Sequence, residues 1–157
     1  MSKISAAELW RFSLRVYANP QVQKALLQWQ DEYDLNVNLC LLLAYLDCHQ
    51  QALDSSQLQA LQTAIAPFNL LALKPLRQVR AEVKAQQESL HDYPALRQQL
   101  LDLELQFERQ QQMQLIQACK TLKLRSESKA NNLALYLPSP LVPLNADLDQ
   151  ALHAIID

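Results

Sequence analysis

The chain has 157 residues, half of them hydrophobic, and a formal net charge of −2 at pH 7. This length suits one ordinary domain with a substantial core, and the hydrophobic fraction excludes a chain that is disordered by composition. The small net charge excludes a strong global attraction to nucleic acid or to anionic lipid.

The sequence contains no glycine. Glycine supplies positive φ angles and lets the backbone approach a phosphate closely. Its absence therefore excludes a P-loop, a dinucleotide-binding fingerprint and a G-x-S-x-G nucleophile elbow. Leu, Ala and Gln dominate the composition, and all three favour helices. We expect an all-α protein whose helices are joined by Asn, Asp, Ser and Pro turns.

The N-terminal third predicts two helices. Ser5 and Glu8 have the spacing of a capping box, which opens the first helix. Asn19 and Pro20 end that helix and start the second, because Asn suits the N-cap and Pro suits the first helical position. The first residues lack the apolar run of a signal peptide, and the three cysteines form no CxxC pair. These features predict a cytoplasmic protein.

Residues 36–50 form the centre of the predicted fold. Nearly every position from Val37 to Leu46 is apolar. A helix that is apolar on all sides must be enclosed by other helices. The run is too short to cross a membrane, which requires roughly 20 apolar residues. We therefore expect this segment to be the central helix of a compact bundle.

Two further helical segments, separated by a turn at 91–94, predict a long antiparallel hairpin over about residues 68–122. Ala66, Pro67 and Phe68 indicate a break or kink just before it, because Pro disfavours helical geometry in the preceding residue. The hairpin should project from the body of the protein.

The C-terminal part predicts an extended, Pro-rich tail that lies on the bundle. A polar loop is expected over 123–132, and three prolines follow within six residues. Asn145 and Asp147 could cap a last helix that holds Leu148, Leu152 and Ile155. The predicted organisation is a single helical domain, with the bundle core over 1–66, the hairpin over 67–122 and the tail over 123–157.

Two stretches of the chain, 10–46 and 66–84, resemble an uncharacterised family of small bacterial proteins known by a domain-of-unknown-function label. The residues that carry the resemblance are Trp10, Phe12, Ser13, Leu14, Tyr17, Pro20, Val22, Gln30, Asp31, Val37, Asn38, Leu39, Ala66, Pro67, Phe68, Pro75, Leu76, Arg77, Arg80 and Lys84. The resemblance is best over the first half of the chain. It implies a small helical protein and brings no assigned activity.

Polar residues gather at the start of the central helix, where they predict either a pocket or helix caps. Amides and backbone N–H groups there could bind a small ligand or a partner's main chain. We favour capping, because short polar side chains satisfy the first N–H groups of a helix. Asn38 differs, since it lies inside an apolar helix, where a buried amide requires a partner. The candidate pocket residues are Trp10, Tyr17, Gln30, Asp31, Asn36 and Asn38.

Four cations in the first half of the hairpin fall within about a third of a helix circumference and predict a basic stripe. Such a stripe could bind phosphate-bearing or acidic partners. We favour a solvated face with local ion pairs, for instance to Glu82 and Glu88. The absence of interleaved aromatic residues disfavours nucleic acid. The stripe consists of Lys74, Arg77, Arg80 and Lys84.

Metal-binding and catalytic patterns are weak in this sequence. Asp47, Cys48 and His49 are adjacent, but neighbouring residues on a helix point apart and chelate poorly. Cys40 lies in the apolar segment, where a cysteine behaves as inert packing. We therefore predict no metal, no cofactor and no enzymatic activity.

The preferred function is a non-enzymatic helical adaptor or regulator that binds a protein partner, through the basic, Gln-rich flank of the hairpin or the Pro-rich tail. The first alternative is a small-ligand binder or an unrecognised enzyme that uses the pocket near Asp31 and Asn38. The second alternative is an RNA- or ribosome-associated factor that uses the stripe from Lys74 to Lys84. The oligomeric state stays open.

Overall fold

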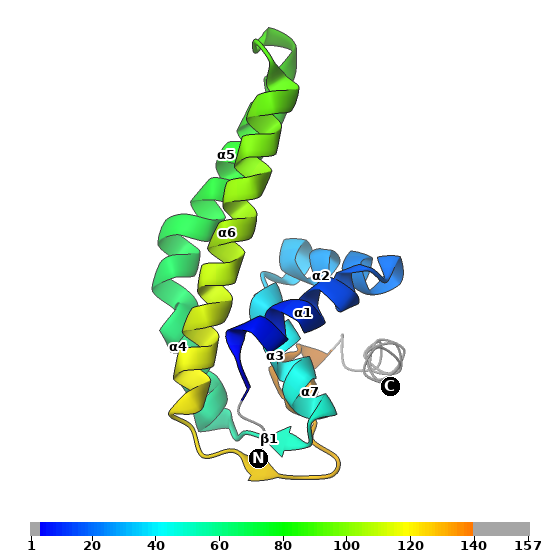
Figure 1. Cartoon of the computed structure of the whole chain (residues 1–157), viewed down its shortest axis with the longest axis vertical. Coiled ribbons are helices and arrows are strands. Elements are labelled where there is room, and N and C mark those ends of the chain that lie inside the picture. The colour runs from blue at the N-terminus through cyan, green and yellow to red at the C-terminus, as the bar shows by residue number, and fades with distance from the viewer. Residues whose placement is uncertain (1–3, 140–157) are drawn as a thin grey trace.

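Helices make up nearly all the regular structure of residues 4–139, the part of the chain that this computed structural model describes. Figure 1 shows a bundle at one end and a long helical hairpin that extends away from it. The helices are α1 (Ala6–Tyr17), α2 (Pro20–Tyr33), α3 (Val37–Cys48), α4 (Ser55–Phe68), the π-helix η1 (Asn69–Leu73), α5 (Lys74–Ala85), the 3₁₀-helix η2 (Gln87–Ser89), α6 (Tyr93–Lys120) and α7 (Asn132–Tyr136). The predicted all-α class is confirmed.

The first two helices begin where local capping chemistry predicts. The Ser5 hydroxyl accepts a hydrogen bond from the Glu8 N–H at 3.1 Å, and the Glu8 carboxylate accepts one from the Ser5 N–H at 3.3 Å. Asn19 caps α2 and Pro20 is its first residue. Asp34 ends α2 with a left-handed φ of 55°. A short polar side chain tolerates this conformation, so the chain turns here without glycine.

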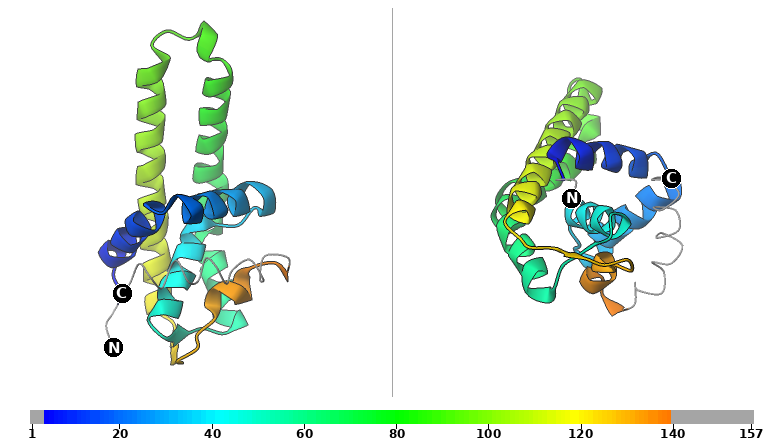
Figure 2. Two further views of the ribbon diagram at one scale, coloured as in Figure 1. Left: turned by 90° about the vertical axis from the view of Figure 1, so that its right-hand side faces the viewer. Right: turned by 60° about the horizontal axis from the view of Figure 1, so that its bottom comes forward.

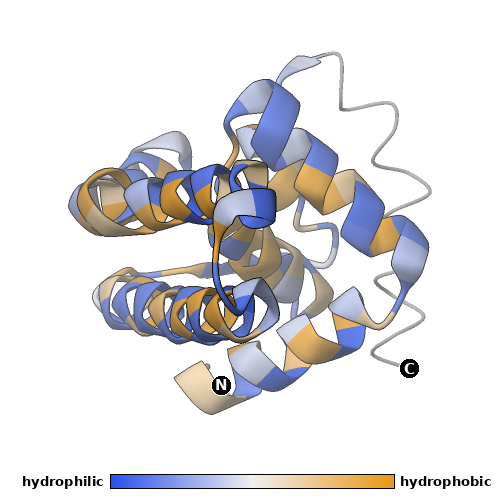
Figure 3. Cartoon of the chain, turned by 90° about the horizontal axis from the view of Figure 1, so that it is seen from above, coloured by the Kyte–Doolittle hydropathy of each residue, from blue (hydrophilic) through white to orange (hydrophobic). Residues whose placement is uncertain are grey.

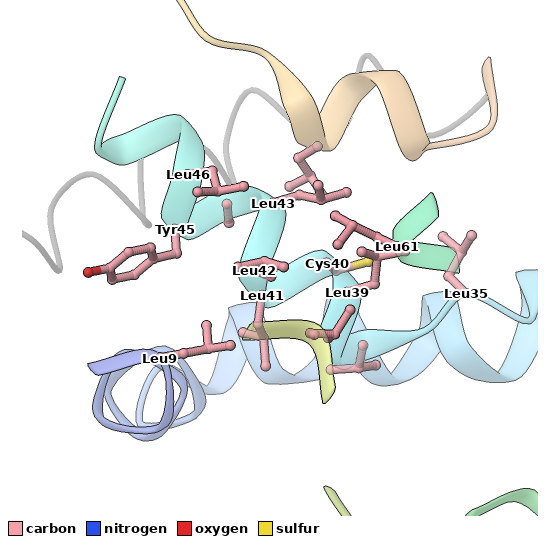
Figure 4. Close-up of a cluster of buried hydrophobic side chains, with 14 of the residues drawn as sticks. Leu9, Leu35, Leu39, Cys40, Leu41, Leu42, Leu43, Tyr45, Leu46 and Leu61 are labelled. Carbon is pink, nitrogen blue, oxygen red and sulfur yellow. The ribbon is translucent and has the colours of Figure 1, made fainter. Parts of the chain in front are cut away.

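α3 is enclosed on all sides, as its sequence predicts. Every residue from Val37 to Asp47 is buried. Helices α1, α2, α6 and α7 all pack against α3, and Figure 4 shows its leucines beside Leu9 of α1 and Leu61 of α4. Since each fully buried leucine contributes roughly 1.5–3 kcal/mol, α3 is the centre of the hydrophobic core.

The hairpin is longer than predicted, because α4, η1 and α5 follow one another without a loop and all pack against α6. Pro67 lies inside α4 and does not end it. In η1 the Lys74 N–H donates to the Asn69 carbonyl, five residues earlier, so the turn is widened. Pro75 follows and lacks an N–H group. The expected break is therefore a π-turn within a continuous helical stretch.

The distal half of the hairpin projects beyond the bundle (Figures 1 and 2). α5 contains no buried residue, and the first buried residue of α6 is Glu104. The helices are joined through η2 and a turn in which Asp92 has a φ of 54°. We call α5, η2 and residues 90–103 the arm.

A short ladder and a short helix replace part of the expected loop and tail. β1 (Gln51–Ala52) pairs antiparallel with β2 (Arg125–Ser126), so the segment predicted as a polar loop contains a strand. α7 packs on α3 and places Leu133 and Leu137 in the core. Within the described residues, the tail therefore packs on the bundle through a short helix and the residue that follows it. The last helix predicted from Asn145 and Asp147 lies outside the described residues, as does most of the Pro-rich segment.

Buried polar contacts hold α7 in place. The Asp47 carboxylate accepts hydrogen bonds from the N–H groups of Asn132 at 2.6 Å and Leu133 at 3.1 Å. The Asn132 side chain accepts from the Leu53 N–H at 2.9 Å and donates to the Gln51 carbonyl at 2.7 Å. A carboxylate at the start of a helix satisfies N–H groups that have no partner within the helix. The ladder and α7 are thus anchored together.

Candidate functional site

Asn36 caps the central helix and also links it to the hairpin. Its Oδ1 accepts from the Leu39 N–H at 2.9 Å. Its Nδ2 donates to Asn69 Oδ1 at 3.3 Å and to Gln111 Oε1 at 3.0 Å. The Asn36 N–H donates to the Tyr136 hydroxyl at 3.0 Å. The capping role predicted for Asn36 is present, and η1, α6 and α7 supply its other partners.

Asn38 is buried, and both ends of its amide have partners. Its Nδ2 donates to Gln111 Oε1 at 3.0 Å and lies 3.4 Å from the Glu108 carbonyl oxygen. Its Oδ1 accepts from Gln112 Nε2 at 3.2 Å, and the same Nε2 donates to the Ser13 hydroxyl at 2.8 Å. The polar atoms at the start of α3 therefore form an amide network that joins α1, α3, η1 and α6.

The six candidate pocket residues differ in their surroundings within residues 4–139. Asn36 and Asn38 meet at Gln111, whereas Asp31 is exposed and lines a shallow hollow on α2. Trp10 is half-buried beneath the Arg109 guanidinium, whose carbon is 5.1 Å from the ring centroid. The remaining two, Tyr17 and Gln30, are half-buried. Burial raises the pKa of the Tyr17 hydroxyl far above its ordinary value, so this phenol stays protonated.

Sequence reasoning missed the network residues on the hairpin, Asn69, Gln111 and Gln112. They lie 33 to 75 residues from the asparagines that they contact. One signal was available, because the apolar stripe of the long helix is interrupted at 108–112. Amides placed where an apolar stripe should continue indicate a buried polar partner on a facing helix.

The basic stripe is largely paired with carboxylates. Lys74 lies 2.6 Å from Asp34. Arg80 donates to Glu104 at 2.6 and 3.3 Å, and Arg77 lies 3.4 Å from Glu104 and 3.6 Å from Glu108. The local pairs predicted for Arg80 or Lys84 with Glu82 and Glu88 are not present among the described residues, because Arg80 points towards Glu104 of α6. Lys84 is the exposed member of the stripe and has no ion pair within residues 4–139.

The outer face of the arm is apolar and uncovered by any element of residues 4–139. Val79 is 49 % exposed and Leu103 is 39 % exposed. Residues two apart on a helix point about 200° apart, so Val79 lies opposite Arg77 and its ion pairs. Figure 3, viewed along the arm, shows hydrophobic positions between hydrophilic ones on both helices. A hollow of about 400 Å³ lies on this face, lined by Pro75, Gln78, Val79, Glu82, Val83, Gln86, Leu90 and Leu96. Leu103 follows Leu96 by seven residues, about two helical turns, so it points to the same side of α6 beyond the hollow.

These features define a class of protein: a helical bundle with a buried central helix and a projecting two-helix arm. The chain belongs to the family described as "Protein of unknown function (DUF2390)", whose model matches residues 8–115. The match extends from α1 into α6 and confirms the predicted membership of an uncharacterised family. No curated protein and no solved structure matches the chain.

Two other kinds of site are absent from the described residues. No helix of residues 4–139 is long and apolar enough to span a bilayer. In the same range, no three His, Cys, Asp or Glu side chains are grouped so that they could hold a metal ion.

Proposed function

We propose that this protein is a non-enzymatic helical adaptor that binds a protein partner on the outer face of its arm. The observation that carries the proposal is the exposure of Val79 and Leu103 on a two-helix arm without a covering layer in residues 4–139. Contiguous exposed apolar surface on a folded protein commonly marks an interaction site. The proposal places the protein in the cytoplasm, in keeping with three cysteines that form no disulfide.

The partner that suits this face is an amphipathic helix. Two antiparallel helices form half of a four-helix bundle, and an added helix would bury the apolar groove between α5 and α6. The border of the hollow consists mainly of uncharged side chains, Gln78 and Gln86, with Glu82 as its single carboxylate. We therefore expect binding that depends on apolar contact and persists at high salt.

The test replaces the two exposed apolar residues of the outer face. Val79→Gln combined with Leu103→Gln should abolish capture of the partner from the native cell, because both anchors lose their apolar contact. Capture is measured by cross-linking and mass spectrometry, followed by direct binding of the purified partner. Both side chains are exposed, so circular dichroism should show unchanged helicity.

Leu105→Gln is the matched control. Leu105 is 48 % exposed on the same helix but points about 200° away from Leu103. Capture should survive this change and also survive about 0.5 M salt, at which surface charges are screened. Equal capture by the Val79→Gln/Leu103→Gln variant and by the wild type would reject the outer face as the binding surface.

The two alternatives have their own tests. A small-ligand binder would show a rise in melting temperature with a metabolite, lost in Asn38→Ala. An RNA-associated factor would show RNA binding that weakens steeply with salt. Lys84 would have to carry much of that binding, since Lys74, Arg77 and Arg80 have carboxylate partners. These pairings favour the adaptor over the RNA-associated factor.

A further inference from the structure

A groove runs between α1 and the C-terminal end of α3, on a different part of the molecule from the arm. Figure 4 shows the Tyr45 ring extending away from the leucine cluster, next to α1. The groove is lined by Glu8, Arg11, Leu14, Arg15, Tyr45 and His49.

The two arginines are available to a ligand. Arg11 and Arg15 are one helical turn apart, so their side chains lie on the same face of α1. Both are exposed, and within residues 4–139 neither forms an ion pair. The one carboxylate of the groove, Glu8, already accepts from the Ser5 N–H and from the Tyr45 hydroxyl, at 3.3 and 3.4 Å. The groove therefore carries an excess of positive charge.

His49, which follows α3 on the side of the groove opposite the arginines, is held in a fixed orientation. Its Nδ1 lies 2.8 Å from the Tyr45 carbonyl oxygen, and its ring stacks on the Tyr45 ring with centroids 4.0 Å apart and planes 19° apart. A carbonyl oxygen only accepts, so Nδ1 carries the hydrogen and Nε2 is the nitrogen left for a ligand. The imidazole face and Leu14, which is 53 % exposed, supply apolar surface beside these polar groups.

We propose that this groove binds a small organic phosphate ester, with Arg11 and Arg15 holding the phosphate and His49 and Leu14 contacting its organic group. A guanidinium forms two parallel hydrogen bonds to one oxyanion. One guanidinium already occupies both oxygens of a carboxylate, which leaves none for the second arginine. A phosphate monoester has three terminal oxygens and accepts from both arginines at once. The chemistry of the groove therefore favours phosphate over carboxylate.

The experiment titrates the full chain with phenyl phosphate and follows the arginine Nε–H and His49 signals by NMR. We expect saturable shifts in the millimolar range that is typical of a single small anion. Arg11→Gln and Arg15→Gln should each weaken binding about threefold to tenfold, since each removes charge-assisted hydrogen bonds. Benzoate should bind more weakly than phenyl phosphate, and benzyl alcohol should not bind.

The controls separate this site from simple charge and from the arm. Arg97→Gln removes an exposed arginine of the arm and should leave phenyl phosphate binding unchanged. The Val79→Gln/Leu103→Gln variant should also bind phenyl phosphate normally, so the two proposals fail independently. Unchanged affinity in an Arg11→Gln/Arg15→Gln variant with wild-type helicity, or equal binding of benzoate, would overturn the assignment.

Discussion

Glu108 is a carboxylate whose burial is only partly compensated. Desolvation raises the pKa of Glu108 above its ordinary value of 4.5, with a contribution from Glu104, and Arg77 and Arg80 oppose the rise. A folded state that holds this proton more tightly than the unfolded chain gains stability at low pH. That contribution to stability is fully present below pH 4.5 and is lost as the pH rises through the raised pKa of Glu108 in the folded state.

Glu108→Gln should remove this pH dependence. We expect the melting temperature of the wild type, relative to the variant, to fall as the pH rises from about 4 to about 8. Thermal unfolding followed by circular dichroism across this range measures the difference. If the melting temperature of the wild type relative to Glu108→Gln stayed constant or rose with pH, the raised pKa of Glu108 would be contradicted. Glu88→Gln, a change on the exposed turn of the arm, serves as the control and should give no such trend.

The three cysteines should differ sharply in reactivity. Burial raises the pKa of Cys40 to about 12 and that of Cys119 to about 11, so at neutral pH almost no thiolate forms at either. Cys48 is only partly buried. With a disulfide reagent on the native protein, Cys48 should account for the fast phase, and a Cys48→Ala variant should react only as it unfolds. Rapid labelling of that variant would contradict burial of the other two thiols.

At the scale of elements, the buried Asp47 carboxylate satisfies the N–H groups at the start of α7. Each oxygen of the Asp47 carboxylate accepts from one N–H group, Oδ1 from Asn132 and Oδ2 from Leu133. Asp47→Asn should loosen α7, because it replaces one of these acceptor oxygens by an NH2 donor. Leaving a buried donor unsatisfied costs about 1–3 kcal/mol. We expect a melting temperature lower by a few degrees and faster hydrogen exchange at Asn132 and Leu133.

Asp54→Asn is the control for this change. Asp54 caps α4 at an exposed position, where its side chain accepts from the Gln57 N–H at 2.8 Å. Asn caps a helix about as well as Asp, so this variant should melt close to the wild type. Similar melting of both variants would show that Asp47 does not hold α7.

Elements whose cause is local could be predicted from the sequence. Ser5 and Asn19 cap helices through side chains a few residues away, and the all-round apolar character of α3 requires enclosure. η1 and the β1–β2 ladder could not be predicted in the same way. A π-turn at Asn69–Leu73 looks like a proline break in sequence, and a two-residue ladder joins segments more than 70 residues apart.

The sequence predicted that Asn38 needs a buried partner but could not identify that partner. Asn38 required a buried partner, and that requirement followed from its position in an apolar helix. Its partners could not be assigned, because Gln111 and Gln112 lie 73 and 74 residues away and hold no special spacing to it. The same limit applies to Arg77, whose partners Glu104 and Glu108 come from the facing helix rather than from its own.

At the scale of the whole molecule, the structure separates a polar, internally paired side from an apolar, unpaired one. The side of the arm that faces α2 contains the ion pairs of Arg77 and Arg80, and Asp31 lies close enough to stabilise the charge of Arg80. The opposite side presents Val79 and Leu103. This asymmetry fixes the arm on the bundle by one side and leaves the other for the proposed partner.

Because α7 is synthesised well after α3, the central helix of the nascent chain lacks part of its cover for some time. The hydrogen bond from Asn132 to Asp47 spans 85 residues, so about 4 to 17 s of synthesis separate α3 from α7. Throughout that interval α3 lacks the cover of α7 and exposes apolar surface to chaperones and to neighbouring nascent chains.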